Sequence, residues 1–202
     1  MIKRDIRNTK VCVIGGAGFL GSHLVDHLID DRDCEVLVLD NLITGLRKHI
    51  HKDAEFQWFD IRDDEDELSR ILKEHNIEYV FNYAAEPYIP ECFDRPMHFF
   101  QINATAVLKV LSACHKAGVK AILQVSSAEI YGDMKGKIKE TDPVEAHSTY
   151  GVSKLAADGL CLRRFAVDDG RGRSAESGRC RCGHGSDPGR RRIICDPVGH
   201  PG

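Results

Sequence analysis

The fold is decided by the stretch Val11-Cys12-Val13-Ile14-Gly15-Gly16-Ala17-Gly18-Phe19-Leu20-Gly21. It starts as an apolar run, passes through a glycine-rich turn and continues into a segment with leucines at helical spacing. Gly15 allows a tight turn, Gly18 lets the backbone approach a pyrophosphate, and Gly21 lets helix and strand pack closely. Because free N–H groups at the helix start face phosphates, we expect this unit to bind a dinucleotide. A turn selected only for its backbone is the alternative.

An acidic residue follows the glycines at the distance that a dinucleotide site requires. Asp40 ends the apolar run Val36-Leu37-Val38-Leu39, about twenty residues beyond the turn. A carboxylate there binds the adenosine ribose hydroxyls and repels the 2′-phosphate of NADP, so the sequence favours NAD. Asp60 and Ile61, at the end of the third predicted strand, are placed beside the adenine. A solvated loop aspartate is the alternative for Asp40.

Short strand patterns alternate with longer amphipathic segments up to about residue 165, which predicts an α/β fold. We expect a Rossmann-like, doubly wound parallel sheet, truncated and without a recognisable substrate domain. The predicted strands are Val11–Gly15, Glu35–Leu39, Glu55–Phe59, Tyr79–Asn82 and Ala121–Ser126. The predicted helices follow Gly18 and cover Asp64–Glu74, Met97–Lys116 and Thr149–Arg164.

The run Tyr150-Gly151-Val152-Ser153-Lys154 places a phenol and an ammonium on one face of a predicted helix. A nearby cation stabilises a phenolate and so lowers the pKa of a tyrosine toward a value suited to a general base. Lys154 can also hold the nicotinamide ribose. In isolation this spacing is an accident of many amphipathic helices, but here it follows a dinucleotide motif.

Polar side chains also follow the predicted strand Ala121–Ser126. Ligands of open parallel sheets bind at the carboxyl ends of the strands. Ser127 can donate a hydrogen bond to an oxygen that becomes a carbonyl, and Glu129 can act on a neighbouring C–H or hydroxyl. A capping or structural acid is the alternative for Glu129.

Composition and charge exclude several classes of protein. The chain has 202 residues, enough for one ordinary domain, with 42% hydrophobic and 29% charged residues. The formal net charge of -3 indicates neither a nucleic-acid nor an anionic-membrane partner. A charged N-terminus and the lack of an apolar stretch of about 18 residues predict no signal peptide and no membrane span, hence a cytoplasmic protein. The eight cysteines are expected to be reduced packing residues.

The composition changes abruptly after Phe165, where Gly, Arg and Pro crowd together without apolar periodicity. We therefore expect a dinucleotide-binding, catalytic domain at residues 1–165 and an irregular tail at residues 166–202. One strand at most is expected in the tail, around Ile193-Ile194. Our hypothesis is that this tail is an aberrant or out-of-frame continuation. Its Cys180-x-Cys182-x-His184 run lacks the usual metal-ligand spacing, so we expect no metal.

Together these motifs resemble the extended short-chain dehydrogenase/reductase family, in its NAD-dependent nucleotide-sugar epimerase/dehydratase branch. The resemblance covers residues 10–165, and Asn82-Tyr83-Ala84-Ala85 and Asn103 add to it. It implies bound NAD, a nucleotide-sugar substrate, and pairing of two copies through the helices Met97–Lys116 and Thr149–Arg164. The implied catalytic residues are Ser127, Glu129, Tyr150 and Lys154. The implied cofactor contacts are Gly15, Gly18, Phe19, Leu20, Gly21, Asp40, Asn41, Thr44, Gly45, Asp60, Ile61, Tyr83, Ala84, Ala85, Asn103, Tyr150 and Lys154, with Asn103 bracing the active-site backbone.

The expected reaction is a transient oxidation at sugar C4 that gives a 4-keto intermediate. Return of hydride to the opposite face makes an epimerase, which we place first. Hexose 4,6-dehydratases often carry an acid before the Glu, where this chain has Ala128, so the usual dehydratase acid is missing. A nucleotide-sugar 4,6-dehydratase or a uronic acid decarboxylase remains the alternative. An alternative of another class is a non-catalytic NAD-binding module that lacks a sugar pocket.

Overall fold

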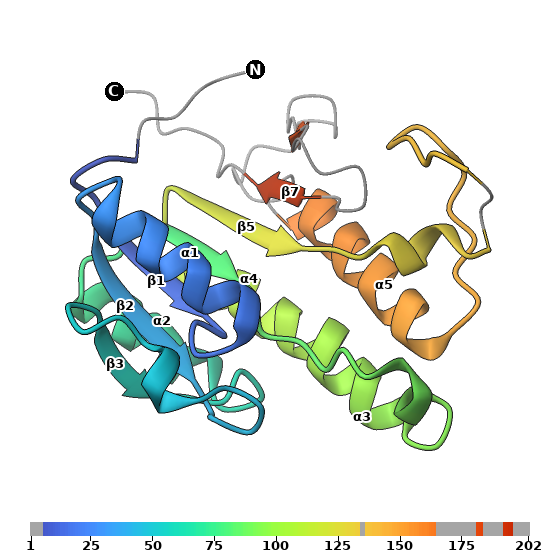
Figure 1. The fold of residues 1–202 in the computed structure, drawn as a ribbon, viewed down its shortest axis with the longest axis horizontal. Helices are drawn as coiled ribbons and strands as arrows, with labels where there is room; N and C mark the ends of the chain where they lie inside the picture. Colours follow the sequence, from blue (N-terminus) through green and yellow to red (C-terminus); the bar gives the residue numbers. More distant parts are fainter. Residues whose placement is uncertain (1–5, 134–135, 165–180, 184–191, 196–202) are drawn as a thin grey trace.

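The computed structural model describes residues 6–133, 136–164, 181–183 and 192–195. At its centre is a sheet in the order β3-β2-β1-β4-β5-β7-β6 (Figure 1). The first five strands run parallel, which confirms the predicted fold class. Their bounds are β1 Lys10–Ile14, β2 Glu35–Asp40, β3 Glu55–Trp58, β4 Tyr79–Asn82 and β5 Ala121–Val125.

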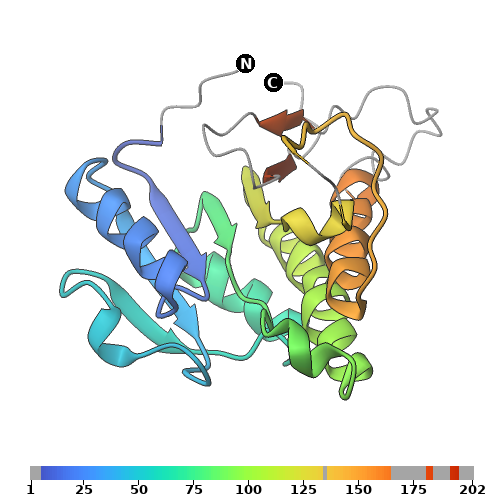
Figure 2. The ribbon, with the colours of Figure 1, turned by 45° about the vertical axis from the view of Figure 1, so that its right-hand side comes forward.

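Helices cover both faces of the parallel strands (Figure 2). On one face α1, Phe19–Asp30, packs against Val11, Val13, Val36 and Val38. On the other face α2, Glu65–Glu74, α4, Ala106–Ala117, and α5, Thr149–Arg164, pack against Cys12, Ile14, Leu37 and Leu39. Both faces of β1 and β2 are therefore buried, which explains the near-continuous apolar runs of these two strands.

The predicted helix Met97–Lys116 is confirmed as a continuous helical stretch, but it is not a regular α-helix throughout. It begins as α3 at Pro96–Phe100, passes through a π-helical turn at Gln101–Thr105, and continues as α4 to Ala117. Gly118 ends it with φ 74°, a left-handed conformation that favours glycine. The π turn holds the buried Asn103, and such turns are frequent at functional sites.

The tail was predicted to contain at most one strand, and this is wrong. Strand β7, Arg192–Cys195, includes the predicted Ile193-Ile194, but a second strand, β6, Arg181–Gly183, pairs with it. Strand β7 runs antiparallel to β5. The reason is that β5 would otherwise leave a row of backbone N–H and C=O groups unpaired. Residues 165–180, 184–191 and 196–202 lie outside the described residues, and so do most of the tail predictions, including those on Cys180 and His184.

Three short 3-10 helices complete the described segments. They are η1 Arg47–His49, η2 Ile89–Cys92 and η4 Ala128–Tyr131. The last one follows β5 directly and brings the predicted catalytic run at Ser127 to the carboxyl edge of the sheet.

Candidate active site

The glycine-rich turn after β1 is held by contacts that leave no room for side chains. The Gly15 N–H donates to the Leu39 carbonyl at 2.7 Å, and Gly15 has φ +78°. A Cβ on Gly15 would lie 2.6 Å from the Ala84 nitrogen, and a Cβ on Gly21 would lie 2.2 Å from the Gly15 carbonyl oxygen. The turn is thus pressed between the end of β4 and the start of α1.

The start of α1 presents its N–H groups to this turn. Gly18 is the N-cap and supplies no capping side chain, and the first turn of α1 carries no acidic residue. Phe19 and Leu20 are exposed, at 75% and 37%. A Cβ on Gly18 would meet, within 4 Å in the described part of the chain, the Gly15 carbonyl oxygen at 3.3 Å. This open, uncapped helix start fits the pyrophosphate of a dinucleotide.

Asp40 is buried at the end of β2 and binds two backbone groups. Its Oδ2 accepts from the Ala17 N–H at 2.9 Å, and its Oδ1 accepts from the Leu42 N–H at 2.8 Å. A Cβ on Gly45 would lie 2.8 Å from the same Oδ1. Asp40 therefore ties the glycine turn to the loop after β2, while each carboxylate oxygen retains a second lone pair for a ribose hydroxyl.

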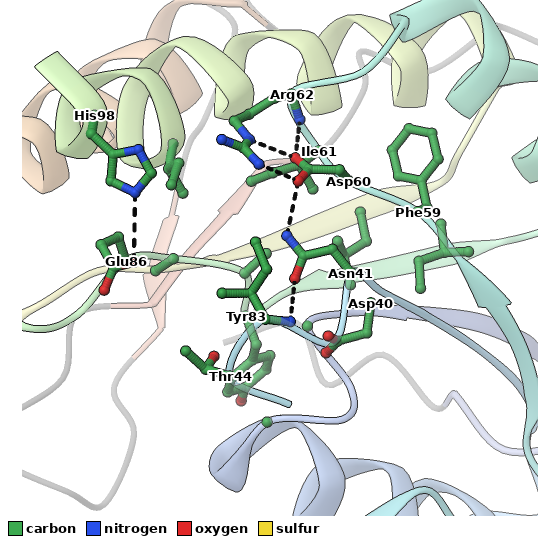
Figure 3. A pocket seen from close by; sticks show the side chains of 18 of the residues that line it. Asp40, Asn41, Thr44, Phe59, Asp60, Ile61, Arg62, Tyr83, Glu86 and His98 are labelled. Carbon is green, nitrogen blue, oxygen red and sulfur yellow. Dashed lines mark hydrogen bonds and ion pairs between the residues drawn. The ribbon is translucent and has the colours of Figure 1, made fainter. Parts of the chain in front are cut away.

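A pocket opens above the carboxyl ends of β1, β2 and β4 (Figure 3). The strand order reverses between β1 and β4, and open α/β sheets bind ligands at such a point. The pocket brings together ten residues that the sequence predicted as cofactor contacts: Gly15, Gly18, Asp40, Asn41, Thr44, Asp60, Ile61, Tyr83, Ala84 and Ala85. Phe19, Leu20, Gly21, Gly45 and Asn103 lie next to this set but outside the lining.

One wall of the pocket is a hydrogen-bonded group around Asp60. Arg62 donates to both Asp60 carboxylate oxygens, with Nε to Oδ1 at 2.9 Å and Nη2 to Oδ2 at 2.6 Å. The Asn41 Nδ2 donates to Asp60 Oδ2 at 2.9 Å, and all three residues are visible in Figure 3. The Arg62 guanidinium holds the pKa of Asp60 well below its usual range. The Asp60 carboxylate is therefore ionised. A ligand in the pocket would contact it as an ion pair with Arg62.

Another part of the pocket lining contains residues that were not predicted from the sequence. Glu86 and His98 form a pair across it, with His98 Nε2 and Glu86 Oε2 3.8 Å apart (Figure 3). Asn103 fixes the backbone of Glu86, since its Oδ1 accepts from the Glu86 N–H at 2.9 Å and its Nδ2 donates to the Glu86 carbonyl at 3.0 Å. The π turn that carries Asn103 thus holds the segment after β4 in place. Glu86 directly follows Ala85, and this adjacency was the available signal.

The predicted catalytic residues lie at the neighbouring carboxyl end of β5 and do not line this pocket. Tyr150, 8% exposed, packs against Cys92 and Phe99. The Lys154 Nζ, on the same helix, donates to the Val125 carbonyl at 2.6 Å. Burial lowers the pKa of Lys154 to about 8.

Ser127 and Glu129 complete this group. Ser127 is the N-cap of η4, and its Oγ accepts from the Glu129 N–H at 3.3 Å. The Glu129 side chain is exposed, and a Cβ on Gly151 would lie 2.8 Å from the Glu129 carbonyl oxygen. The start of α5 therefore packs closely on η4, which keeps Tyr150 near the end of β5.

The described segments show neither a metal-binding group nor a membrane-spanning helix. The described residues contain no group of three or more His, Cys, Asp or Glu side chains that could hold a metal ion. Within the same residues, no helix has the length and apolarity needed to cross a bilayer. Cys12, Cys34, Cys92, Cys114 and Cys161 are buried free thiols.

Proteins similar to this chain share one family. The model of the NAD dependent epimerase/dehydratase family matches residues 11–171. A UDP-glucose 4-epimerase from Lacticaseibacillus casei is 40% identical over 149 residues, which are 73% of this chain and 44% of that protein.

Solved structures give the same result. The Thermus thermophilus UDP-glucose 4-epimerase in complex with NAD has a TM-score of 0.71 at 35% identity, covering 75% of this chain and 49% of that chain. DesIV, a dTDP-glucose 4,6-dehydratase from Streptomyces venezuelae with NAD and TYD bound, has a TM-score of 0.70 at 30% identity, covering 76% and 51%. The chain thus spans about half the length of the relatives that it matches.

Proposed function

The chain belongs to the NAD-dependent epimerase/dehydratase family, and from this premise we propose that it forms the cofactor-binding and catalytic part of a nucleotide-sugar 4-epimerase. The observation that carries the proposal is the position of Lys154, whose Nζ is bound to the end of β5 at Val125. This contact fixes the Tyr150–Lys154 pair at the same edge of the sheet as the glycine-rich turn. The domain division at residue 165 and the site residues are parts of the proposal.

The residues of the pocket fit NAD. The uncapped start of α1 and the bare Gly18 accommodate a pyrophosphate, and the relatives with NAD bound have the same fold. Asp40 accepts ribose hydroxyls with its remaining lone pairs and repels a 2′-phosphate. Asp60 and Arg62 face the adenine, and Tyr83, Ala84 and Ala85 form the floor after β4. Arg62 is engaged with Asp60, which supports NAD over NADP.

NAD supplies a hydride acceptor and donor for sugar C4 when it is bound. Tyr150 takes the proton of the 4-hydroxyl as that oxygen becomes a carbonyl, and returns it after the hydride is given back. The ammonium of Lys154, one helical turn away, stabilises the phenolate form of Tyr150. Ser127 donates a hydrogen bond to the 4-oxygen, where negative charge develops. Burial of Tyr150 against Cys92 and Phe99 reduces its access to water.

Two features favour epimerisation over elimination. The residue between Ser127 and Glu129 is Ala128, so the acid often present there in 4,6-dehydratases is missing. The Glu129 side chain is exposed rather than held toward a ligand by another described group. The similarity to a UDP-glucose 4-epimerase supports a UDP-hexose as substrate, and we place the reaction in the cytoplasm.

A homodimer is also part of the proposal. Exposed apolar side chains lie on the helices expected to pair, including Phe100, Leu108 and Val152. Association of these helices with those of a second copy would remove that apolar surface from water.

The test separates cofactor binding from turnover. The purified 202-residue chain is titrated with NAD by calorimetry and then incubated with NAD and UDP-glucose or UDP-galactose, with the epimeric product measured by chromatography. We expect NAD to bind; interconversion of the two sugars would exclude the non-catalytic module. Tyr150→Phe should keep NAD affinity within a factor of about two and reduce turnover by at least about 100-fold. Failure to bind NAD would refute the cofactor site, whereas NAD binding without product from either sugar would refute the enzyme in favour of the non-catalytic module.

A further inference from the structure

A buried carboxylate on α5 has no role in the reaction described above. Asp158 lies one helical turn beyond Lys154 and is 2% exposed. The hydroxyl of Ser126 donates to Asp158 Oδ2 at 2.7 Å, and Ser126 is itself buried. An ionised carboxylate rarely stays at such a depth without partners that offset its desolvation.

Ser126 and its neighbour Val125 connect two polar side chains of α5 to the end of β5. The Val125 carbonyl accepts from Lys154 Nζ at 2.6 Å, and the Ser126 hydroxyl donates to Asp158. Two consecutive residues of the strand thus bind two side chains that are one turn apart on the helix. These two hydrogen bonds fix both the height and the rotation of α5 against the sheet.

The charge of Asp158 acts on Lys154. Lys154 is 2% exposed, and burial disfavours its ammonium form, whereas Asp158 and Cys161 oppose that effect. Other titratable groups lie on the elements packed against α5. His98 of α3 pairs with Glu86, Cys114 of α4 neighbours Cys12 and Cys161, and Cys92 of η2 packs on Tyr150. Glu129 of η4 is exposed, Tyr131 of η4 is buried, and β7 carries Arg192 and Cys195. Asp158 is therefore the acidic residue that compensates the buried ammonium.

We propose that Asp158, held by the Ser126 hydroxyl, is a positioning residue that keeps Lys154 protonated and directed at the end of β5. Along the helix axis, Asp158 is one turn, about 6 Å, from Lys154 and two turns, about 12 Å, from Tyr150. Its attraction for Lys154 therefore outweighs its direct repulsion of a Tyr150 phenolate. This inference rests on the proposed function in so far as Lys154 supports Tyr150.

The test measures the protonation of Lys154 directly. The chain is prepared with lysine labelled with ¹³C at Cε, the Lys154 signal is assigned with Lys154→Met, and its chemical shift is followed by NMR from the lowest pH at which the chain stays folded up to pH 11. We expect Asp158→Asn to lower the midpoint from about 8 to about 7 or below. Asp158→Glu should restore most of the shift. Asp31→Asn, which removes the acid of an exposed His27–Asp31 pair one turn apart on α1, is the matched control and should leave the midpoint in place.

An unchanged Lys154 midpoint in folded Asp158→Asn would overturn the inference. If that variant does not fold, the unsubstituted chain provides the same information. Its Lys154 signal should shift a second time in the acidic range, when Asp158 takes up a proton. A folded chain in which that acidic shift is missing would equally contradict the proposal.

Two further readouts separate this inference from the proposed function. NAD affinity, measured by calorimetry at pH 5.5, where Lys154 is protonated in both proteins, should stay within a factor of about two in Asp158→Asn, because Asp158 itself does not line the pocket. For an active enzyme, kcat of this variant should fall more than KM rises, and the pH profile should move with the Lys154 midpoint. A chain that shows the Lys154 shift but turns over no sugar refutes the enzyme and leaves the role of Asp158 intact. A chain that turns over sugar but shows no change of the Lys154 midpoint in Asp158→Asn refutes the role of Asp158 and leaves the enzyme intact.

Discussion

Replacing Gly21 with alanine tests whether the glycine turn is as tightly packed as the structure indicates. A Cβ at this position would lie 2.2 Å from the Gly15 carbonyl oxygen and 2.9 Å from the Gly16 Cα. These are backbone atoms of a turn that is itself fixed by hydrogen bonds from the Gly15 N–H to Leu39 and from the Gly18 N–H to Gly15. No flexible side chain can move to relieve the overlap, so α1 has to move away from the turn.

The expected change in stability follows from two opposing effects. Overpacking in a rigid environment destabilises by about 3 kcal/mol, and the better helix propensity of alanine returns about 1 kcal/mol. The net loss of about 2 kcal/mol corresponds to a fall in Tm of about 4–8 °C for a chain of this size. Gly159→Ala is the matched control, because Gly159 lies in α5 with no described atom within 4 Å of the added Cβ. It should raise Tm by about 2–4 °C.

The assay is thermal unfolding followed by circular dichroism, with and without NAD. The parent chain and Gly159→Ala should both be stabilised by NAD, whereas Gly21→Ala should lose most of that stabilisation because its turn is displaced from the pyrophosphate position. A Gly21→Ala variant that unfolds at or above the parent's temperature and still gains stability from NAD would refute both the packing argument and the assigned cofactor site.

Three further predictions concern Asp40, the ion pair of Arg62 with the buried Asp60, and Lys154. Asp40→Asn replaces an acceptor of two backbone N–H groups by a side chain with one acceptor oxygen, so NAD affinity should fall about tenfold and NADP should compete better in calorimetry. Arg62→Met should lower stability by about 1–2 kcal/mol at pH 7. Because the folded pKa of Asp60 lies well below its unfolded value, this loss should begin to shrink only below the ordinary aspartate range and should be mostly retained at pH 3, as urea unfolding at pH 7 and pH 3 would show. Lys154 has a folded pKa of about 8 against 10.5 unfolded, so the parent gains stability as pH rises between these values. The free energy of unfolding of Lys154→Met relative to the parent should therefore fall by on the order of 3 kcal/mol from pH 7 to pH 10.5, and a constant difference would contradict the burial of this ammonium.

The parallel core could be predicted because each of its signals is local. The alternation of apolar runs and helical periods gave five strands whose observed bounds differ from the predicted ones by at most one residue at either end. The helix Thr149–Arg164 has the predicted bounds. What the sequence did not predict depends on distant partners: the π turn carries Asn103, which binds the backbone of Glu86, and β6 pairs with a strand that pairs with β5. Neither partner is recognisable from the sequence around the element itself.

Prediction of the site was limited in the same way, by contacts between residues that are distant in the sequence. The sequence placed Asp40 at a ribose, but it could not show that the carboxylate also holds the Ala17 N–H of the turn, which folds next to it from 23 positions away. It likewise missed His98, because a histidine on a helix has no motif around it and becomes part of the pocket only through its pairing with Glu86. Residue type and spacing therefore predicted groups that line the pocket, while the groups that hold them in place required the tertiary structure.

The distance between the pocket and the Tyr150–Lys154 pair indicates how long a ligand that contacts both has to be. The pocket lies over β2, β1 and β4, whereas Lys154 is bound to the end of β5. Since neighbouring strands are about 4.8 Å apart, the distance from β2 to β5 across the sheet is about 14 Å. The Asn82 side chain donates to Gln124 at 2.7 Å and keeps the ends of β4 and β5 in register. An adenosine moiety with Asp40 at its ribose cannot reach β5, and a ligand that contacts both places has to extend along the sheet edge through a pyrophosphate at the start of α1. A dinucleotide meets that requirement and a mononucleotide does not, so the dimensions of the sheet support the same cofactor as the residues that line it.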